Sequence, residues 1–338
     1  MRDPSLPECK IENRKSKIEN PLRVLVMGAG SIGSAIGGFL GKGGHEVTLV
    51  SLDQAHLEAI GKNGLRITGI WGEHVVRGLR TRSDLEGLRP GDFDLIIVSV
   101  KSYDTAMAAA AVRPVVDEAT LVCSYQNGLG NAERIAEVVG WERTIGARVI
   151  YGVRLPEPGC AEITVIAAPT ALGVYHADAP AERVRAMAAA MDASGNPTEY
   201  TDAIATLLWA KVAYNCALNP LSALLDVPYG VLVETDHTLD IIREIIAEIY
   251  DVADAMQVRM DPATADGYMD FFVGTLLPPT AAHYASMRED FVHQRRTEID
   301  ALNGCICRYG REHGVPCPTN AFLTRLVRAR EHALGVRY

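Results

Sequence analysis

The stretch VLVMGAGSIGSAIGGFLGKGGHEVTLV, Val24 to Val50, decides the fold. It begins as an apolar strand, passes through a glycine-rich turn into a helical pattern and ends in a second β-branched strand. The turn has the spacing GxGxxG, in which the first glycine permits the tight turn, the second lets a pyrophosphate approach and the third allows close helix packing. The phosphates would lie at the helix N-terminus, where free N–H groups favour anions. We predict a dinucleotide cradle made of Gly28, Ala29, Gly30, Ser31, Ile32 and Gly33.

The strand and helix pattern continues beyond this segment and predicts an α/β domain. Apolar, β-rich runs occur at Arg23–Met27, Glu46–Val50, Asp94–Val100, Thr120–Ser124 and Thr144–Tyr151. Because helix-like segments separate several of these runs, we expect a parallel sheet. The segment Glu162–Tyr175 has strand character with no helix before it, so we expect it to close the domain as an antiparallel pair.

After about Thr201 the pattern becomes helical. Asp240–Met256 places isoleucine and valine at helical spacing, and helices are also predicted over Glu298–Tyr309, ending at Gly310, and over Thr319–Leu334. We therefore predict a Rossmann-type domain over residues 22–201 and an all-helical, substrate-binding and catalytic domain over 202–338. Residues 1–21 carry the polar repeat KIEN twice and are predicted to be a disordered leader.

Composition excludes several classes of protein. The net charge of -9 argues against a nucleic-acid partner, and no apolar run approaches the roughly 20 residues that span a bilayer. The chain has seven cysteines, an odd number, and no CxxC pair that would indicate a metal site. Buried free thiols in a cytoplasmic protein account for them best.

Polar residues follow two further predicted strands. Lys101 comes directly after the apolar run that ends at Val100, and Asn127 lies just beyond the run that ends at Ser124. Ligands of doubly wound sheets gather outside the carboxyl ends of the strands, so both residues are predicted to face the dinucleotide cradle. The alternatives are a surface lysine and a plain Asn-Gly turn.

The segment LLWAKVAYNCALNPLSALL, Leu207–Leu225, contains the densest set of candidate residues. Lys211, Asn215 and Asn219 are spaced by four and form one stripe on a helix whose other positions are mostly apolar. Polar groups in such surroundings are costly unless they have partners, which favours a functional stripe over a solvent-facing edge.

Three other candidates each have two open interpretations. Asp53 lies 20 residues beyond Gly33, where a carboxylate can bind a ribose hydroxyl, but it can also be a solvated loop residue. Ser286 precedes Glu289 by three residues, so a helix cap competes with a binding role. Glu298 is either a site residue or an acid at a helix start.

The motifs GAGSIG, VKSYD, QNGLG, WAKVAYNCALNPLSAL and SM…TEID, in this order from about Leu22 to the C-terminus, resemble those of the ketopantoate reductases. The resemblance implies hydride transfer from NAD(P)H to the ketone of a small 2-oxo acid. It also implies that Lys211 protonates the carbonyl oxygen with support from Glu298. Asn215, Asn219 and Ser286 match positions that hold substrate, while Lys101 and Asn127 match positions beside the nicotinamide.

Two departures from the family pattern matter. Ten residues after Asn219 the family usually has an asparagine, whereas this chain has Tyr229, which remodels the predicted substrate pocket. NADPH is the family default, but no arginine follows the second strand, and Asp53 would repel a 2′-phosphate, so NADH is favoured.

The alternative functions are a dehydrogenase of a bulkier 2-hydroxy acid and a dinucleotide-sensing protein without turnover. The sequence leaves open whether the apolar face of Asp240–Met256 packs internally or forms a homodimer.

Overall fold

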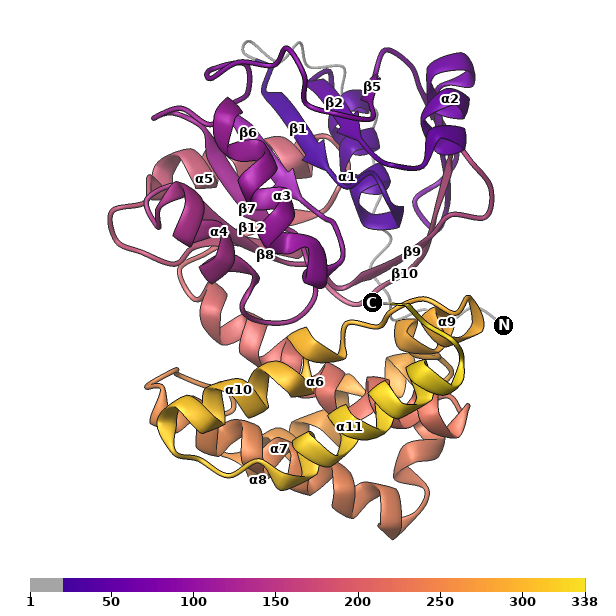
Figure 1. Cartoon of the computed structure of the whole chain (residues 1–338), viewed down its shortest axis with the longest axis vertical. Coiled ribbons are helices and arrows are strands. Elements are labelled where there is room, and N and C mark those ends of the chain that lie inside the picture. Colours follow the sequence, from indigo (N-terminus) through magenta and orange to yellow (C-terminus); the bar gives the residue numbers. More distant parts are fainter. Residues whose placement is uncertain (1–20, 338) are drawn as a thin grey trace.

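The computed structural model describes residues 21–337, so the predicted leader, apart from Pro21, lies outside the described residues. The described chain forms two lobes (Figure 1). We call the upper one in this view, which contains all the strands, the sheet lobe, and the lower one, which contains helices α6 to α11, the helical lobe. The expectation of a Rossmann-type α/β domain followed by helices is confirmed.

The main sheet has eight strands in the order β12-β11-β8-β7-β6-β1-β2-β5. All neighbours pair in parallel except β8 and β11. The strands are β1 (Arg23–Met27), β2 (Glu46–Val50), β5 (Arg80–Arg82), β6 (Leu95–Val98), β7 (Leu121–Ser124), β8 (Thr144–Arg148), β11 (Thr170–Val174) and β12 (Thr198–Thr201). Four-residue buried runs such as LIIV in β6 are typical of strands that are covered on both faces.

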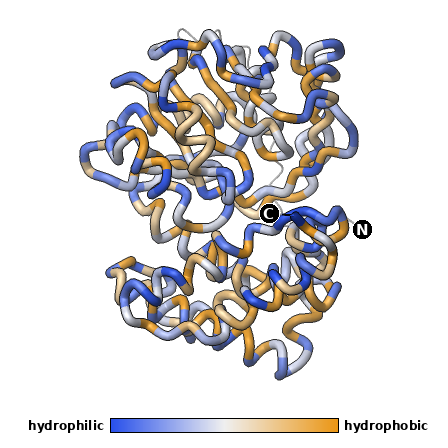
Figure 2. The backbone as a smooth tube through the Cα atoms, viewed as in Figure 1, coloured by the Kyte–Doolittle hydropathy of each residue, from blue (hydrophilic) through white to orange (hydrophobic). Residues whose placement is uncertain are grey.

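Helices cover both faces of this sheet. Buried side chains of α1 (Ser31–Lys42) and α5 (Ala181–Ala193) share one apolar core with the sheet. Side chains of α3 (Thr105–Val112) and α4 (Asn131–Val139) build a second core with residues such as Leu25 and Val98. Figure 2 shows hydrophobic stretches along the central strands and hydrophilic ones in peripheral loops. Because β1, β6 and β7 are parallel neighbours, their carboxyl ends lie at one edge of the sheet.

A second, four-stranded sheet has the order β4-β3-β10-β9. Its strands are β3 (Leu65–Gly69), β4 (His74–Val76), β9 (Tyr151–Arg154) and β10 (Cys160–Ile166), and α2 (Gln54–Asn63) precedes it. One prediction was wrong here, and a second was confirmed only in part. The run Thr144–Tyr151 is divided between β8 and β9 in different sheets. The segment Glu162–Tyr175 does pair antiparallel, but not as one unit: β10 pairs antiparallel with β9 in the second sheet, while β11 pairs antiparallel with β8 in the main sheet.

The helical lobe is built around α6 (Ile204–Leu225), which contacts β8 and β11 and then packs against α7 and α9. The other helices are α7 (Asp236–Ala255), α8 (Ala265–Phe271), α9 (Ser286–Val292), α10 (Asn303–His313) and α11 (Pro318–Ala333). Their apolar faces form one core. None of the helices within residues 21–337 combines the length and the hydropathy that a membrane span requires.

The predicted helix over Glu298–Tyr309 differs from the observed one at both ends. A short 3-10 turn, Ile299–Ala301, comes first, and α10 then runs past Gly310 to His313, where Gly314 has φ 74°. Gly310 does not end the helix. A glycine is needed at this position because the chain after α10 folds back beside it. A Cβ there would lie 2.6 Å from the Val315 carbonyl oxygen.

Candidate active site

The glycine turn after β1 has the geometry of a phosphate cradle. Gly28 has φ +105°, and a Cβ there would lie 2.7 Å from the backbone nitrogen of Val100. A Cβ on Gly33 would collide with the Gly28 carbonyl oxygen, so the third glycine is required for packing of α1 on the turn. A Cβ on Gly30 would meet nothing within 4 Å, and α1 begins at the next residue, Ser31, without a side-chain cap. The second glycine and the helix N-terminus therefore leave room for a pyrophosphate, and these residues fit a dinucleotide.

Lys211 on α6 reaches from the helical lobe to the sheet lobe. Its Nζ donates a hydrogen bond of 2.7 Å to Oδ1 of Asn127, which follows β7. Burial lowers the pKa of Lys211 from 10.5 to about 8 and outweighs the opposing effect of Glu298, while nearby Arg148 lowers it further. An ammonium whose pKa lies near neutral pH can give up its proton readily and is suited to general acid catalysis.

Lys101 forms a second bridge between the lobes. Its Nζ lies 2.9 Å from Oδ2 of Asp290 on α9 and 3.7 Å from Oε2 of Glu298. Burial alone would lower the pKa of Lys101, but Glu298 and Asp290 together outweigh it and raise that pKa. Lys101 therefore stays a cation at neutral pH, whereas Lys211 is poised to lose its proton. The two lysines have different chemical capacities because only Lys101 is paired with carboxylates.

Glu298 contacts the sheet lobe at a second residue besides Lys101. Its Oε1 accepts a 2.9 Å hydrogen bond from the backbone N–H of Ser102. The carboxylate thus lies between Lys101 and Ser102 and also acts electrostatically on Lys211. Of the two interpretations of Glu298, this geometry favours a site residue that joins the two lobes.

The remaining residues of the α6 stripe lie one and two turns beyond Lys211. Asn215 is partly exposed, and Asn219 is buried with its Oδ1 accepting a 2.6 Å hydrogen bond from the Tyr229 hydroxyl. Tyr229 is itself 5% exposed and packs edge-on against Tyr214, at a ring-centroid distance of 6.0 Å. Tyr229 therefore binds the amide oxygen of Asn219, and the amide nitrogen of Asn219 stays available as a donor.

Ser286 is the first residue of α9 and is exposed, with Ala285 at the N-cap. No side-chain cap bond forms at this helix, so the capping interaction with Glu289 is absent. Ser286 precedes Asp290 by four residues and shares its helix face, which is the face that contacts Lys101.

Asp53 is the N-cap of α2, and its Oδ1 accepts a 3.0 Å hydrogen bond from the backbone N–H of His56. The exposed carboxylate of Asp53 thus has a structural role as a helix cap, in addition to the predicted contact with a ribose. One cation beside this strand end was not predicted from the sequence. Arg82, the last residue of β5, pairs with Val50, the last residue of β2.

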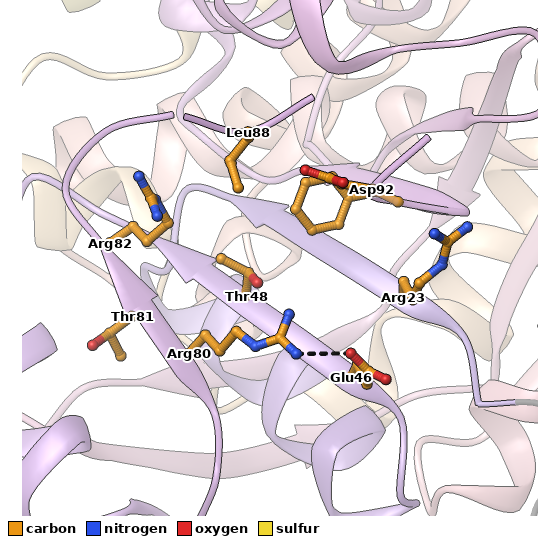
Figure 3. Close-up of a pocket in the computed structure, with 9 residues that line it drawn as sticks. Arg23, Glu46, Thr48, Arg80, Thr81, Arg82, Leu88 and Asp92 are labelled. Atoms are coloured by element: carbon orange, nitrogen blue, oxygen red, sulfur yellow. Dashed lines mark hydrogen bonds and ion pairs between the residues drawn. The ribbon is translucent and has the colours of Figure 1, made fainter. Parts of the chain in front are cut away.

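The side chain of Arg82 is bound to Asp84 and to the Glu86 carbonyl. It lines a cavity of about 410 Å³ on the sheet face, with Arg80 and its partner Glu46 (Figure 3). No pattern in the sequence marks Arg82, since β5 is a three-residue strand that joins β2 out of chain order.

Asp290, which contacts Lys101, was also not predicted from the sequence. Its side chain is 4% exposed and also lies 3.3 Å from Arg295. Burial raises the pKa of Asp290, although Lys101 opposes the shift.

The side chains that lie together where the lobes join are thus Lys101, Lys211, Asn127, Asp290 and Glu298. The glycine turn lies at the same edge of the main sheet as Lys101 and Asn127. The described residues contain no group of three or more histidine, cysteine or acidic side chains placed to hold a metal ion. The six cysteines of the described region are free and buried.

Comparison with known proteins gives matches over both lobes. A family model described as ketopantoate reductase PanE/ApbA matches residues 24–176, and the model of its C-terminal part matches residues 203–331. The 2-dehydropantoate 2-reductase of Aquifex aeolicus (strain VF5) is 39% identical over 311 residues, covering 92% of this chain and 97% of the relative.

Two solved structures superpose closely on the chain. A PanE/ApbA family ketopantoate reductase from Ralstonia eutropha JMP134 has a TM-score of 0.82 and 32% identity, covering 93% of this chain and 100% of that one. D-mandelate dehydrogenase, solved with NADH and anilino(oxo)acetate, has a TM-score of 0.83 and 26% identity, covering 94% and 100%.

Proposed function

This chain belongs to the ketopantoate reductase family, and we propose that it reduces 2-dehydropantoate to the 2-hydroxy acid with NAD(P)H at the junction of its two lobes. The cofactor supplies the hydride that attacks the ketone carbon. The single observation that carries the proposal is Lys211, which has a pKa of about 8 and whose ammonium is held by Asn127.

Lys211 is proposed to donate its proton to the ketone oxygen, so that the C=O bond becomes CH–OH without a free alkoxide. Burial makes the ammonium acidic enough for this transfer, and Asn127 orients it toward the sheet lobe. Glu298 acts on Lys211 through its negative charge and prevents the pKa from falling further. The ketone carbon thus gains the hydride and the ketone oxygen gains the proton of Lys211, while the reduced cofactor is oxidised.

The substrate contacts are proposed from the positions of three side chains. Asn215 lies on the α6 stripe one turn beyond Lys211, and the amide nitrogen of Asn219 is available because Tyr229 binds only the oxygen. Ser286 is exposed on the face of α9 that also carries Asp290. Hydroxyl and amide donors of this kind suit the carboxylate and hydroxyl groups of a small 2-oxo acid.

NADH is the proposed preferred cofactor. The loop of residues 51–53 after β2 carries the carboxylate of Asp53 and no basic residue, which disfavours a 2′-phosphate. Arg82 is the cation nearest in register to that loop, but it is bound to Asp84 and the Glu86 carbonyl. A 2′-phosphate would have to compete with those contacts.

A bulkier 2-oxo acid is the second candidate substrate, on the ground that buried Tyr229 replaces the usual asparagine. Superposition on D-mandelate dehydrogenase, at 26% identity, is compatible with this candidate.

The test is steady-state oxidation of NADH and of NADPH with ketopantoate and, separately, with phenylglyoxylate at matched concentrations. Turnover of ketopantoate with NADH as the faster cofactor is expected. Turnover only with phenylglyoxylate would show that the substrate is a bulkier 2-oxo acid and not ketopantoate. Equal efficiency with NADPH would overturn the proposed preference for NADH. Cofactor binding without turnover of either acid would favour a sensor.

A further inference from the structure

A buried chain of hydrogen bonds ends on the glycine turn. The backbone N–H of Gly159, in the β9–β10 turn, donates to Nδ1 of His56 over 3.0 Å. The Nε2 atom of His56 lies 2.9 Å from Oγ of Ser34, and that hydroxyl donates to the Ala29 carbonyl oxygen over 3.2 Å. Ser34 is fully buried and His56 is 1% exposed. Neither side chain has a part in the function proposed above.

The direction of these bonds is determined by the first donor. A backbone N–H can only donate, so Nδ1 of His56 accepts and carries no proton. Nε2 therefore carries the ring proton and donates to Ser34, whose own hydrogen is then directed to Ala29. Burial favours this neutral ring because it lowers the pKa of His56, with Asp53 acting in the opposite direction.

The orientation of the Ala29 carbonyl matters for binding of an anion. A carbonyl oxygen that faced a pyrophosphate would repel it, whereas N–H groups attract it. Both carbonyls at the start of the turn are held by hydroxyl groups of the protein. Gly28 is bound by Oγ of Ser99 over 2.8 Å, and Ala29 is bound by Ser34. Ser99 directly follows β6, while the hydroxyl hydrogen of Ser34 is directed to Ala29 because His56 donates to the Ser34 oxygen.

We propose that Ser34 and His56 are positioning residues for dinucleotide binding: together they turn the Ala29 carbonyl away from the phosphates and connect the glycine turn to the β9–β10 turn. The inference rests on the proposed NAD(P)H-dependent function. It adds a specific means by which the small second sheet influences cofactor affinity, although the residues of that sheet need not touch the cofactor.

Two substitutions of His56 test the two ends of this chain of hydrogen bonds separately. In His56→Asn the amide oxygen can take the place of Nδ1 and keep the bond from Gly159, but the donor to Ser34 is lost. In His56→Gln the amide nitrogen can take the place of Nε2 and restore that donor. Ser34→Ala removes the hydroxyl itself in a helix that tolerates alanine. His45→Asn is the matched control, because His45 is also buried and accepts from a backbone N–H, that of Leu22, over 3.0 Å.

The measurement is the Kd for NADH by fluorescence titration without substrate, together with kcat and the KM for NADH. The bond to Ala29 is removed in Ser34→Ala and loses its fixed direction in His56→Asn. Each variant is therefore expected to raise Kd about tenfold, as for one lost hydrogen bond, with KM rising far more than kcat falls. His56→Gln should recover most of the affinity, and His45→Asn should bind as the unaltered protein does. Circular dichroism of each variant checks that it is folded.

Equal weakening in His56→Asn and His56→Gln would overturn the inference, since packing of the ring and not the bond to Ser34 would then control affinity. Unchanged Kd in Ser34→Ala would also overturn it. If the unaltered protein bound neither NADH nor NADPH, the proposed function itself would fail.

Discussion

Replacing Lys211 with methionine should slow the reaction and stabilise the protein. Methionine retains the apolar stem of lysine and removes the ammonium, so no proton donor remains for the ketone oxygen. A positioned general acid typically contributes about 10² to 10⁴ in rate, and kcat should fall by a factor in that range. The opposite direction of the two effects distinguishes a catalytic lysine from a structural one.

The gain in stability follows from the depressed pKa. A fall from 10.5 to about 8 means that the folded state disfavours the ammonium by about 3 kcal/mol at pH 7, at about 1.4 kcal/mol per pH unit. The lost hydrogen bond to Asn127 costs about 1 kcal/mol, so Lys211→Met should be more stable by about 2 kcal/mol.

The gain should depend on pH in a defined direction. Between pH 8 and 10.5 the unfolded chain keeps the lysine proton while the folded chain has lost it, so the unaltered protein becomes more stable as pH rises. The advantage of Lys211→Met should therefore shrink through this window and reverse at its upper end.

Urea unfolding at pH 7 and at pH 10, with kcat for ketopantoate reduction, measures both effects. Lys211→Arg is the control, because it keeps a charge that is not released and should lose rate without gaining stability. A Lys211→Met variant that is destabilised at pH 7 would refute the reasoning, because the ammonium would then be a stabilising group. Retention of full activity would refute the proposed role as proton donor.

Three further outcomes are expected. The rate of ketone reduction should fall about tenfold per pH unit above pH 8 as Lys211 loses its proton, measured as kcat from pH 6 to 10; a flat profile would exclude it as the acid. Gly30→Ala should weaken NADH binding at least tenfold with little change in melting temperature, whereas Gly33→Ala should lower the melting temperature because its Cβ collides with the turn. Tyr229→Phe should cost about 1 to 2 kcal/mol in urea unfolding, because buried Asn219 loses a partner, and an unchanged midpoint would contradict the observed bond.

The strands β1, β2, β6, β7 and β8 of the main sheet were predictable from sequence because they are short apolar runs, several of them separated by helices. Strands β5 and β12 of the same sheet were not predicted, because they are short and polar. The second sheet was not predicted, because it depends on pairing between distant segments. Cys160 in β10 lies opposite Arg66 in β3, and no local pattern records that contact. The end of α10 was misplaced for a similar reason, since Gly310 accommodates a returning segment and does not terminate its helix.

The candidate site was predictable where its residues share one helix or follow a strand. Lys211, Asn215 and Asn219 are linked by a spacing of four, which the sequence displays directly. Asp290 is an ordinary acid in a polar stretch of sequence, and only the fold brings it to Lys101, 189 residues away.

Helix α6 has a consequence for how the chain folds. It begins against β8 and β11, yet most of its length is the centre of the helical core, where Trp209 stacks on Tyr309 at a ring-centroid distance of 5.9 Å. A fragment that stops before residue 204 would expose apolar surface of the sheet, and a fragment that starts after residue 225 would lack the centre of its own core. The two lobes are therefore distinct in shape but are joined through α6. Loss of α6 would remove the centre of the helical core, whereas the two apolar cores of the sheet lobe contain no residue of this helix.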